Sequence, residues 1–177
     1  MSNQWVVDAS HTNASFSVRH MMITNVRGEF QKLEGTVSWD PAAPAATQIE
    51  ATIDVASINT RDAQRDGHLK SPDFFDVEKF PKLTFKSKSV TAKDKEHLSV
   101  TGDLTIHGVT KEVVLDVEGP SAPSTDPFGN TRVGATATTK IKRDDFGLVW
   151  NAALETGGVL VGHDVSITID ISLIKQK

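Results

Sequence analysis

Along most of the chain, apolar and polar residues alternate with the two-residue period of a β-strand that has one buried and one wet face. Every second residue from Val165 to Leu173 is apolar, and the residues between them are serine, threonine and aspartate. The same alternation recurs between turn-forming residues, and His107-Gly108 separates two such runs as a hairpin turn would. We therefore predict eight or so strands, which include residues 14–18, 30–40, 48–58, 98–106, 113–117, 133–141 and 165–173.

Antiparallel strands with one apolar face each must curl so that these faces meet. A closed barrel achieves this and removes exposed strand edges, and a two-sheet sandwich is the alternative. Several core-facing positions hold small residues, namely Ala51, Gly102, Ala135, Ala137 and Thr139. Barrels of about eight strands have an interior that is either just filled or holds one ligand. The pattern thus predicts an all-β fold. It does not decide whether the interior is filled or holds a ligand.

Residues 59–81 are the long interruption of the strand pattern. Asn59 or Thr60 is placed to cap a short helix, and Ser71-Pro72-Asp73 repeats such a start signal. We predict one or two short helices that form a lid, or that plug the barrel as ordinary core. Three of the eight phenylalanines lie close together here and are expected to fold onto the sheet: Phe74, Phe75 and Phe80.

A second interruption is Arg143-Asp-Asp-Phe-Gly147. It predicts a short helical turn near residues 143–148. The turn at Gly147 is expected to let Phe146 fold inward.

Composition limits the classes of function. The 177 residues fit one domain, residues 1–177, and the absence of cysteine excludes disulfides and cysteine metal sites. A net charge of −4 with both signs interspersed gives no basic stripe for nucleic acid. The sequence contains no apolar run long enough for an integral membrane segment. The start MSNQWVVDASHT lacks the features of an export signal, so as written we expect a cytoplasmic location.

Several segments are similar to the YceI-like proteins of bacteria. The most specific are RDGHLKSPDFFDV at residues 65–77 and LTIHGVTK at residues 104–111, and FSVRH at residues 16–20 and VGHDVSITIDI at residues 161–171 extend the resemblance over nearly the whole chain. The resemblance implies an extended eight-stranded antiparallel barrel of lipocalin type. It implies a bound polyisoprenoid-type lipid, such as a long isoprenoid quinone, with no other cofactor, and a homodimer. Many members carry a secretion signal, so a periplasmic location applies if one was removed.

Inward-facing apolar residues are the candidates for ligand contact. With the aromatic residues of the interruptions, they form the predicted cavity lining: Phe16, Val18, Phe30, Trp39, Ile53, Leu69, Phe74, Phe75, Phe80, Phe85, Leu104, Ile106, Phe146 and Trp150. Four polar residues are candidates for head-group contacts, or else for solvated turns and salt bridges: His11, His20, Arg61 and Arg65.

The sequence shows no catalytic or metal-binding set. No two of the six histidines have HxH, HxxxH or HExxH spacing. Asp8 could orient His11 as a general base, but no GxSxG nucleophile accompanies the pair. We predict non-enzymatic binding of a long amphiphile. The alternatives are an enzyme that acts on an amphiphilic ester or isoprenoid through His11 or His20, and a filled barrel that serves as an interaction module.

Overall fold

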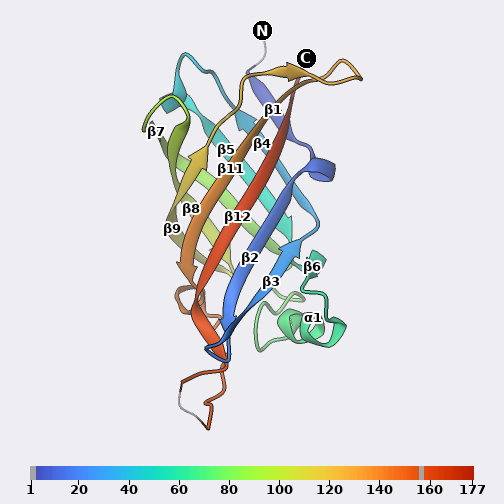
Figure 1. Ribbon diagram of the computed structural model, residues 1–177, viewed down its shortest axis with the longest axis vertical. Coiled ribbons are helices and arrows are strands. Elements are labelled where there is room, and N and C mark those ends of the chain that lie inside the picture. The colour runs from blue at the N-terminus through green and yellow to red at the C-terminus, as the bar shows by residue number, and fades with distance from the viewer. Residues whose placement is uncertain (1–2, 156–157) are drawn as a thin grey trace.

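The computed structural model describes residues 3–155 and 158–177, and these are mainly β-strands (Figure 1). The strands are β1 (Gln4–Val7), β2 (Asn13–His20), β3 (Thr24–Phe30), β4 (Leu33–Ser38), β5 (Gln48–Asp54), β6 (Ile58–Asn59), β7 (Lys82–Ala92), β8 (His97–Ile106), β9 (Val109–Glu118), β10 (Ser124–Thr125), β11 (Thr131–Lys142) and β12 (Val161–Lys175). The helical elements are α1 (Ala63–Lys70) and the 3₁₀ turns η1 (Ala9–His11), η2 (Pro44–Ala46), η3 (Val55–Ser57) and η4 (Arg143–Phe146).

Eight of the strands form a closed antiparallel barrel. Their order around the barrel is β11, β9, β8, β7, β5, β4, β1 and β12, and β12 pairs back onto β11. This closing pair runs from Arg132 opposite Ile174 to Lys142 opposite Asp164. The closed barrel confirms the predicted fold, and the sandwich alternative is wrong.

Beyond the barrel, β2, β3 and β6 extend the wall at one end. The long strand β12 pairs with β1 near its C-terminal end and with β2 over the rest, so β1 and β2 act as one strand interrupted by η1. Likewise β4 pairs with β1 and β3 with β2. In the described part of the chain β6 pairs with β3 and has no pairing with β7. The wall is therefore incomplete between β6 and β7, and α1 lies beside β6 there (Figure 1).

The interruption at residues 59–81 contains one α-helix in the structure. Asp62 caps α1, because its carboxylate accepts a hydrogen bond from Arg65 N at 3.0 Å. The predicted caps are wrong: Asn59 accepts from Arg61 N, and the backbone N–H of Thr60 donates to Asp66. Residues after the helix form hydrogen-bonded turns instead of a second helix.

Two local predictions are confirmed. The hairpin between β8 and β9 turns at His107-Gly108, with Ile106 opposite Val109. The turn near residues 143–148 is η4, which ends at Gly147 in the left-handed region, and Phe146 is fully buried.

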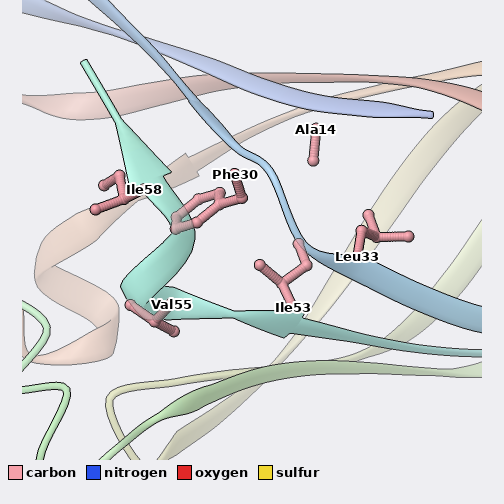
Figure 2. Close-up of a cluster of buried hydrophobic side chains, with 6 residues drawn as sticks. All are labelled: Ala14, Phe30, Leu33, Ile53, Val55 and Ile58. Atoms are coloured by element: carbon pink, nitrogen blue, oxygen red, sulfur yellow. The ribbon is translucent and has the colours of Figure 1, made fainter. Parts of the chain in front are cut away.

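Buried apolar side chains, most of them from the strands, form four clusters among the described residues. One of them joins β2, β3, β4, β5 and β6 close to the incomplete wall, and Figure 2 shows its members: Ala14, Phe30, Leu33, Ile53, Val55 and Ile58. Phe75 and Leu69 of the interruption pack against this cluster. The interruption is thus held by the same core that holds the strands.

Candidate ligand cavity

The barrel encloses an apolar cavity of about 270 Å³. Its lining runs from Trp39 and Pro120, near the end that holds the chain termini, to Leu148 and Val161 at the other end. Almost all lining side chains are aliphatic or aromatic. Such a space can hold a hydrocarbon chain and offers little to a polar molecule.

Most polar side chains along the cavity are already hydrogen-bonded to the backbone. Ser15 Oγ donates to Thr168 O at 3.1 Å, Thr47 Oγ1 to Pro44 O at 2.6 Å, and Thr139 Oγ1 to Val114 O at 2.9 Å. Because these hydroxyls have partners in the wall, they do not need water or a ligand to satisfy them. At these positions the cavity therefore offers no free hydroxyl group to a ligand, although the lining residues are polar.

Two aromatic rings lie against glycines of the wall. A β-carbon on Gly28 would be 2.5 Å from Cζ of Phe16, and one on Gly102 would be 2.5 Å from Cζ of Phe85. The small residue Gly102 therefore adds no space to the cavity, because the Phe85 ring lies over it. Of the other small residues, Ala51, Ala135, Ala137 and Thr139 do line the cavity.

Residues 59–81 contribute Leu69, Phe74 and Phe75 to the lining. Phe74 is 7 % exposed, and its ring centroid lies 5.4 Å from that of Trp150. The Trp150 ring also meets His68 of α1 edge-on, with centroids 4.8 Å apart. This segment covers the incomplete part of the wall, and we call residues 60–81 the lid.

Eleven of the fourteen predicted lining residues are in the cavity wall: Phe16, Val18, Phe30, Trp39, Ile53, Leu69, Phe74, Phe75, Phe85, Leu104 and Ile106. Whether they contact a ligand stays a prediction.

The other three predicted lining residues lie elsewhere, and their assignment to the lining is corrected. Phe80 packs on His107 and against Gly108 at the β8–β9 turn. Phe146 is buried in a cluster with Leu104, Ile106, Ile141 and Leu148, and Trp150 packs on His68 and Phe74 of the lid.

The four candidates for head-group contacts do not line the cavity. His11 is exposed and lies on a polar outer groove. His20 is the last residue of β2, and Arg61 is exposed at a left-handed position before α1. Arg65 donates from Nε to Thr60 Oγ1 and from Nη2 to Thr60 O, so it holds the start of the lid.

The predicted hydrogen bond between Asp8 and His11 is present, at 2.7 Å. Ser10 Oγ also meets His11 Nδ1, at 3.0 Å. In a Ser-His-Asp triad the nucleophile and the carboxylate meet opposite ring nitrogens, whereas here both meet Nδ1. The arrangement is that of a capped turn.

Asp8 is held mainly by Arg132, which also binds Asp126. Arg132 Nη1 lies 2.6 Å from Asp8 Oδ2, and Arg132 Nε lies 2.6 Å from Asp126 Oδ2. Hydrogen bonds from this guanidinium hold the pKa of both carboxyls well below the usual range. We call Arg132, Asp8 and Asp126 the Arg132 cluster. Its ion pairs connect η1 to the turn before β11.

Arg143 is a buried, charged lining residue that the sequence interpretation missed. It is 4 % exposed, and its guanidinium donates to four carbonyls, those of Leu148, Trp150, Val161 and Gly162. Burial lowers its pKa below the ordinary arginine value. Arg143 thus anchors the loop between η4 and β12, at the end of the cavity lined by Leu148 and Val161.

Among the described residues, no three histidine, cysteine or carboxylate side chains gather as a metal site would require. No helix in the described ranges has the length and apolar character needed to span a bilayer.

Comparison with known proteins identifies the family. The model of the YceI-like domain matches residues 5–173. The chain belongs to the YceI-like family. Its relatives include the UPF0312 protein SA2479 of Staphylococcus aureus strain N315, which is 40 % identical over 158 residues that cover 89 % of this chain and 90 % of that one.

Solved structures share the fold of this YceI-like chain. The Campylobacter jejuni YCEI protein is 33 % identical with a TM-score of 0.76 and covers 90 % of each chain. Burkholderia cenocepacia BcnA is 26 % identical with a TM-score of 0.80, covering 94 % of this chain and 98 % of that one. A polyisoprenoid binding domain from Saccharophagus degradans, at 17 % identity and a TM-score of 0.70, covers 97 % and 98 %.

Proposed function

We propose that this protein binds a long-chain amphiphile of the polyisoprenoid or isoprenoid quinone type in its barrel and carries or stores it without chemical conversion. The observation that supports this most is the apolar cavity, whose polar side chains are nearly all bonded to the wall. The family and the polyisoprenoid binding domain of the same fold point the same way. Each methylene moved from water into such a cavity gains about 0.8 kcal/mol, so a chain binds without special polar chemistry.

The cavity is too small for a long ligand, so the protein must change its conformation to bind one. At about 270 Å³ the cavity is slightly smaller than most ligand pockets, which span roughly 300–1,000 Å³. Four aromatic rings line the cavity, those of Phe16, Phe85 and the lid residues Phe74 and Phe75. We infer that loading moves the lid outward and reorients these rings, so the ligand enters through the incomplete wall between β6 and β7.

The test is to measure lipid in the gently purified protein by native mass spectrometry with organic extraction, before and after incubation with long-chain isoprenoid quinones. Ala137→Phe places a ring in the cavity, and we expect it to abolish the lipid-bound mass. Thr138→Phe, the matched control, adds the same ring to the exposed side of β11 and should bind like the wild type. A lipid-free wild type after incubation, or equal binding by both variants, would contradict the proposal.

The oligomeric state and the cellular location expected from the sequence are part of this proposal. The expected homodimer is tested by light scattering of the purified protein. The cellular location is tested by fractionating cells that produce the full gene product.

A further inference from the structure

One end of the barrel carries large apolar side chains in water. Met21, Met22 and Ile23, in the turn between β2 and β3, are 44, 53 and 70 % exposed, and Val149 is 66 % exposed. We call these four residues the apolar tip. In Figure 1 the turn lies at the lower end of the barrel, opposite the chain termini, and the loop before β12 extends further in the same direction. Three consecutive exposed apolar residues are unusual for a turn, which normally carries small or polar residues.

The backbone of this turn makes the choice of residues more unusual. The N–H of Ile23 donates to His20 O at 3.1 Å, and the central residues Met21 and Met22 have φ of 52° and 63°. Turns with two left-handed residues strongly prefer Asn-Gly, because a β-carbon is strained there. Folding alone therefore does not explain two methionines at these positions, and such violations of local rules are expected at functional sites.

The apolar tip is connected to the lid. Met21 N donates to Leu160 O at 2.8 Å, and Met22 packs near Gly158, so the turn rests on the loop before β12. In the same loop, Val149 is followed directly by Trp150, whose ring packs on His68 and Phe74 of the lid. Since Phe74 lines the cavity, these contacts link the apolar tip through Trp150 to the lid.

We propose that the apolar tip docks this end of the barrel on a lipid bilayer by inserting its side chains among the headgroups. The purpose of docking rests on the proposed function: lipid would pass between the bilayer and the cavity beneath the lid without crossing water. Exposed charges of both signs occur on the two strands that the turn joins and in η4, including Arg19, Arg27 and Asp145. Binding is therefore driven by apolar insertion and depends little on salt or on anionic lipid.

A second copy of the chain fits the apolar tip less well than a bilayer. A stable protein interface buries roughly 800 Å² on each partner, far more than four partly exposed side chains provide. A bilayer needs no complementary shape, and shallow insertion of a few side chains gives weak, reversible binding. Weak binding suits a carrier that must leave the membrane again.

The test is flotation with phosphatidylcholine vesicles, comparing the wild type with the double variant Met21→Asn, Met22→Gly. This variant removes the apolar side chains and installs the dipeptide that the turn geometry prefers, so the fold is retained or stabilised. Phe128→Ser is the control, because Phe128 is 88 % exposed in the turn between β10 and β11 at the opposite end. We expect the double variant to bind vesicles about tenfold more weakly than the wild type and Phe128→Ser to bind equally.

A second measurement separates docking from lipid binding. Each protein receives a long-chain isoprenoid quinone either from vesicles or by dilution from ethanol, and native mass spectrometry follows uptake. The double variant should lose uptake from vesicles and keep uptake from ethanol. Failure of the wild type to take up quinone by either route, with flotation intact, would overturn the proposed function and leave docking supported.

Three outcomes overturn docking. They are a wild type that does not float, equal flotation of the wild type and the double variant, and an equal loss in Phe128→Ser. A change of oligomeric state in the double variant, seen by light scattering without vesicle binding by the wild type, would assign the apolar tip to a second copy instead.

Discussion

The phenyl ring of Phe85 on β7 lies against Gly102 on the neighbouring strand β8. A β-carbon on residue 102 would be 2.5 Å from Phe85 Cζ and 2.6 Å from the carbonyl oxygen of Lys86. Both separations are shorter than real β-carbon contacts. Gly102 therefore allows the ring to lie close to the wall, and the space in the centre of the barrel depends on that position.

Gly102→Ala should force Phe85 toward the cavity and strain the pairing of β7 with β8. We expect a loss of about 1–3 kcal/mol in the free energy of unfolding, as for other overpacked cores, measured by urea denaturation. Adding Phe85→Leu should restore only part of the loss, because the Lys86 carbonyl remains. Gly67→Ala in α1 is the control: nothing lies within 4 Å of its new methyl group, and helix propensity predicts a gain of roughly 0.5–1 kcal/mol. A Gly102→Ala protein as stable as the wild type would contradict this packing.

The Arg132 cluster predicts a pH-dependent contribution to stability. A carboxyl whose pKa is lowered by folding stabilises the protein above its unfolded pKa, and the contribution is lost as pH falls through the folded pKa. Asp8 and Asp126 are such groups, each with an ordinary pKa of 3.8. Arg132→Met should therefore lower Tm at neutral pH, and its difference from the wild type should shrink as pH falls below about 4.

The control for Arg132→Met is Lys88→Met. Lys88 Nζ lies 2.8 Å from Glu112 Oε2, but both side chains are more than half exposed, so this pair contributes little. Thermal melts across the pH range check both variants. A constant Tm difference for Arg132→Met at every pH would show that the guanidinium acts through packing alone.

The barrel could be predicted from the sequence because its strands alternate regularly. Alternation from Val165 to Leu173 became part of β12, which pairs with β11, β1 and β2 and closes the fold. The same alternation set the direction of the strand residues that line the cavity. It did not show the break between β3 and β4, where the N–H groups of Gln31 and Lys32 donate to Ser57 Oγ, a contact made across 25 or more residues.

Residues in irregular segments were predicted less well, because no period sets their direction. Phe80, Phe146 and Trp150 are aromatic and buried or partly buried, yet each packs outside the cavity. Arg143 was missed although a signal existed. The alternation that turns Ala137, Thr139 and Ile141 inward also turns residue 143 inward, and its positive charge concealed this.

Arg143 is predicted to be essential for the end of the cavity that Leu148 and Val161 line. Arg143→Ala removes a donor from four carbonyls, of which that of Val161 still accepts from Asn151 Nδ2. Each buried unsatisfied group costs about 1–3 kcal/mol, so we expect a loss of roughly 3 kcal/mol or more. Arg143→Lys should recover little, because an ammonium cannot reproduce the planar fork. Hydrogen exchange should rise in residues 148–162 while the β8–β9 hairpin stays protected. Full stability of Arg143→Lys would contradict the role given to the guanidinium.

Trp150 is predicted to control how fast the lid opens. Its ring packs on His68 and Phe74, and aromatic pairs of this kind contribute about 0.5–1.5 kcal/mol beyond burial. Trp150→Ala should therefore raise the rates of lipid loading and release by about tenfold. The amount bound at equilibrium should change little, because Trp150 does not line the cavity.

Stopped-flow transfer of a fluorescent isoprenoid between protein and detergent micelles measures both rates, and micelles avoid any effect on membrane docking. Phe128→Ala, which removes an exposed ring at the opposite end, is the control and should leave both rates unchanged. Hydrogen exchange in α1 should increase in Trp150→Ala, because the lid has lost two ring contacts. Unchanged rates combined with faster exchange in α1 would show that lipid enters elsewhere, and the incomplete wall between β6 and β7 would then not be the entrance.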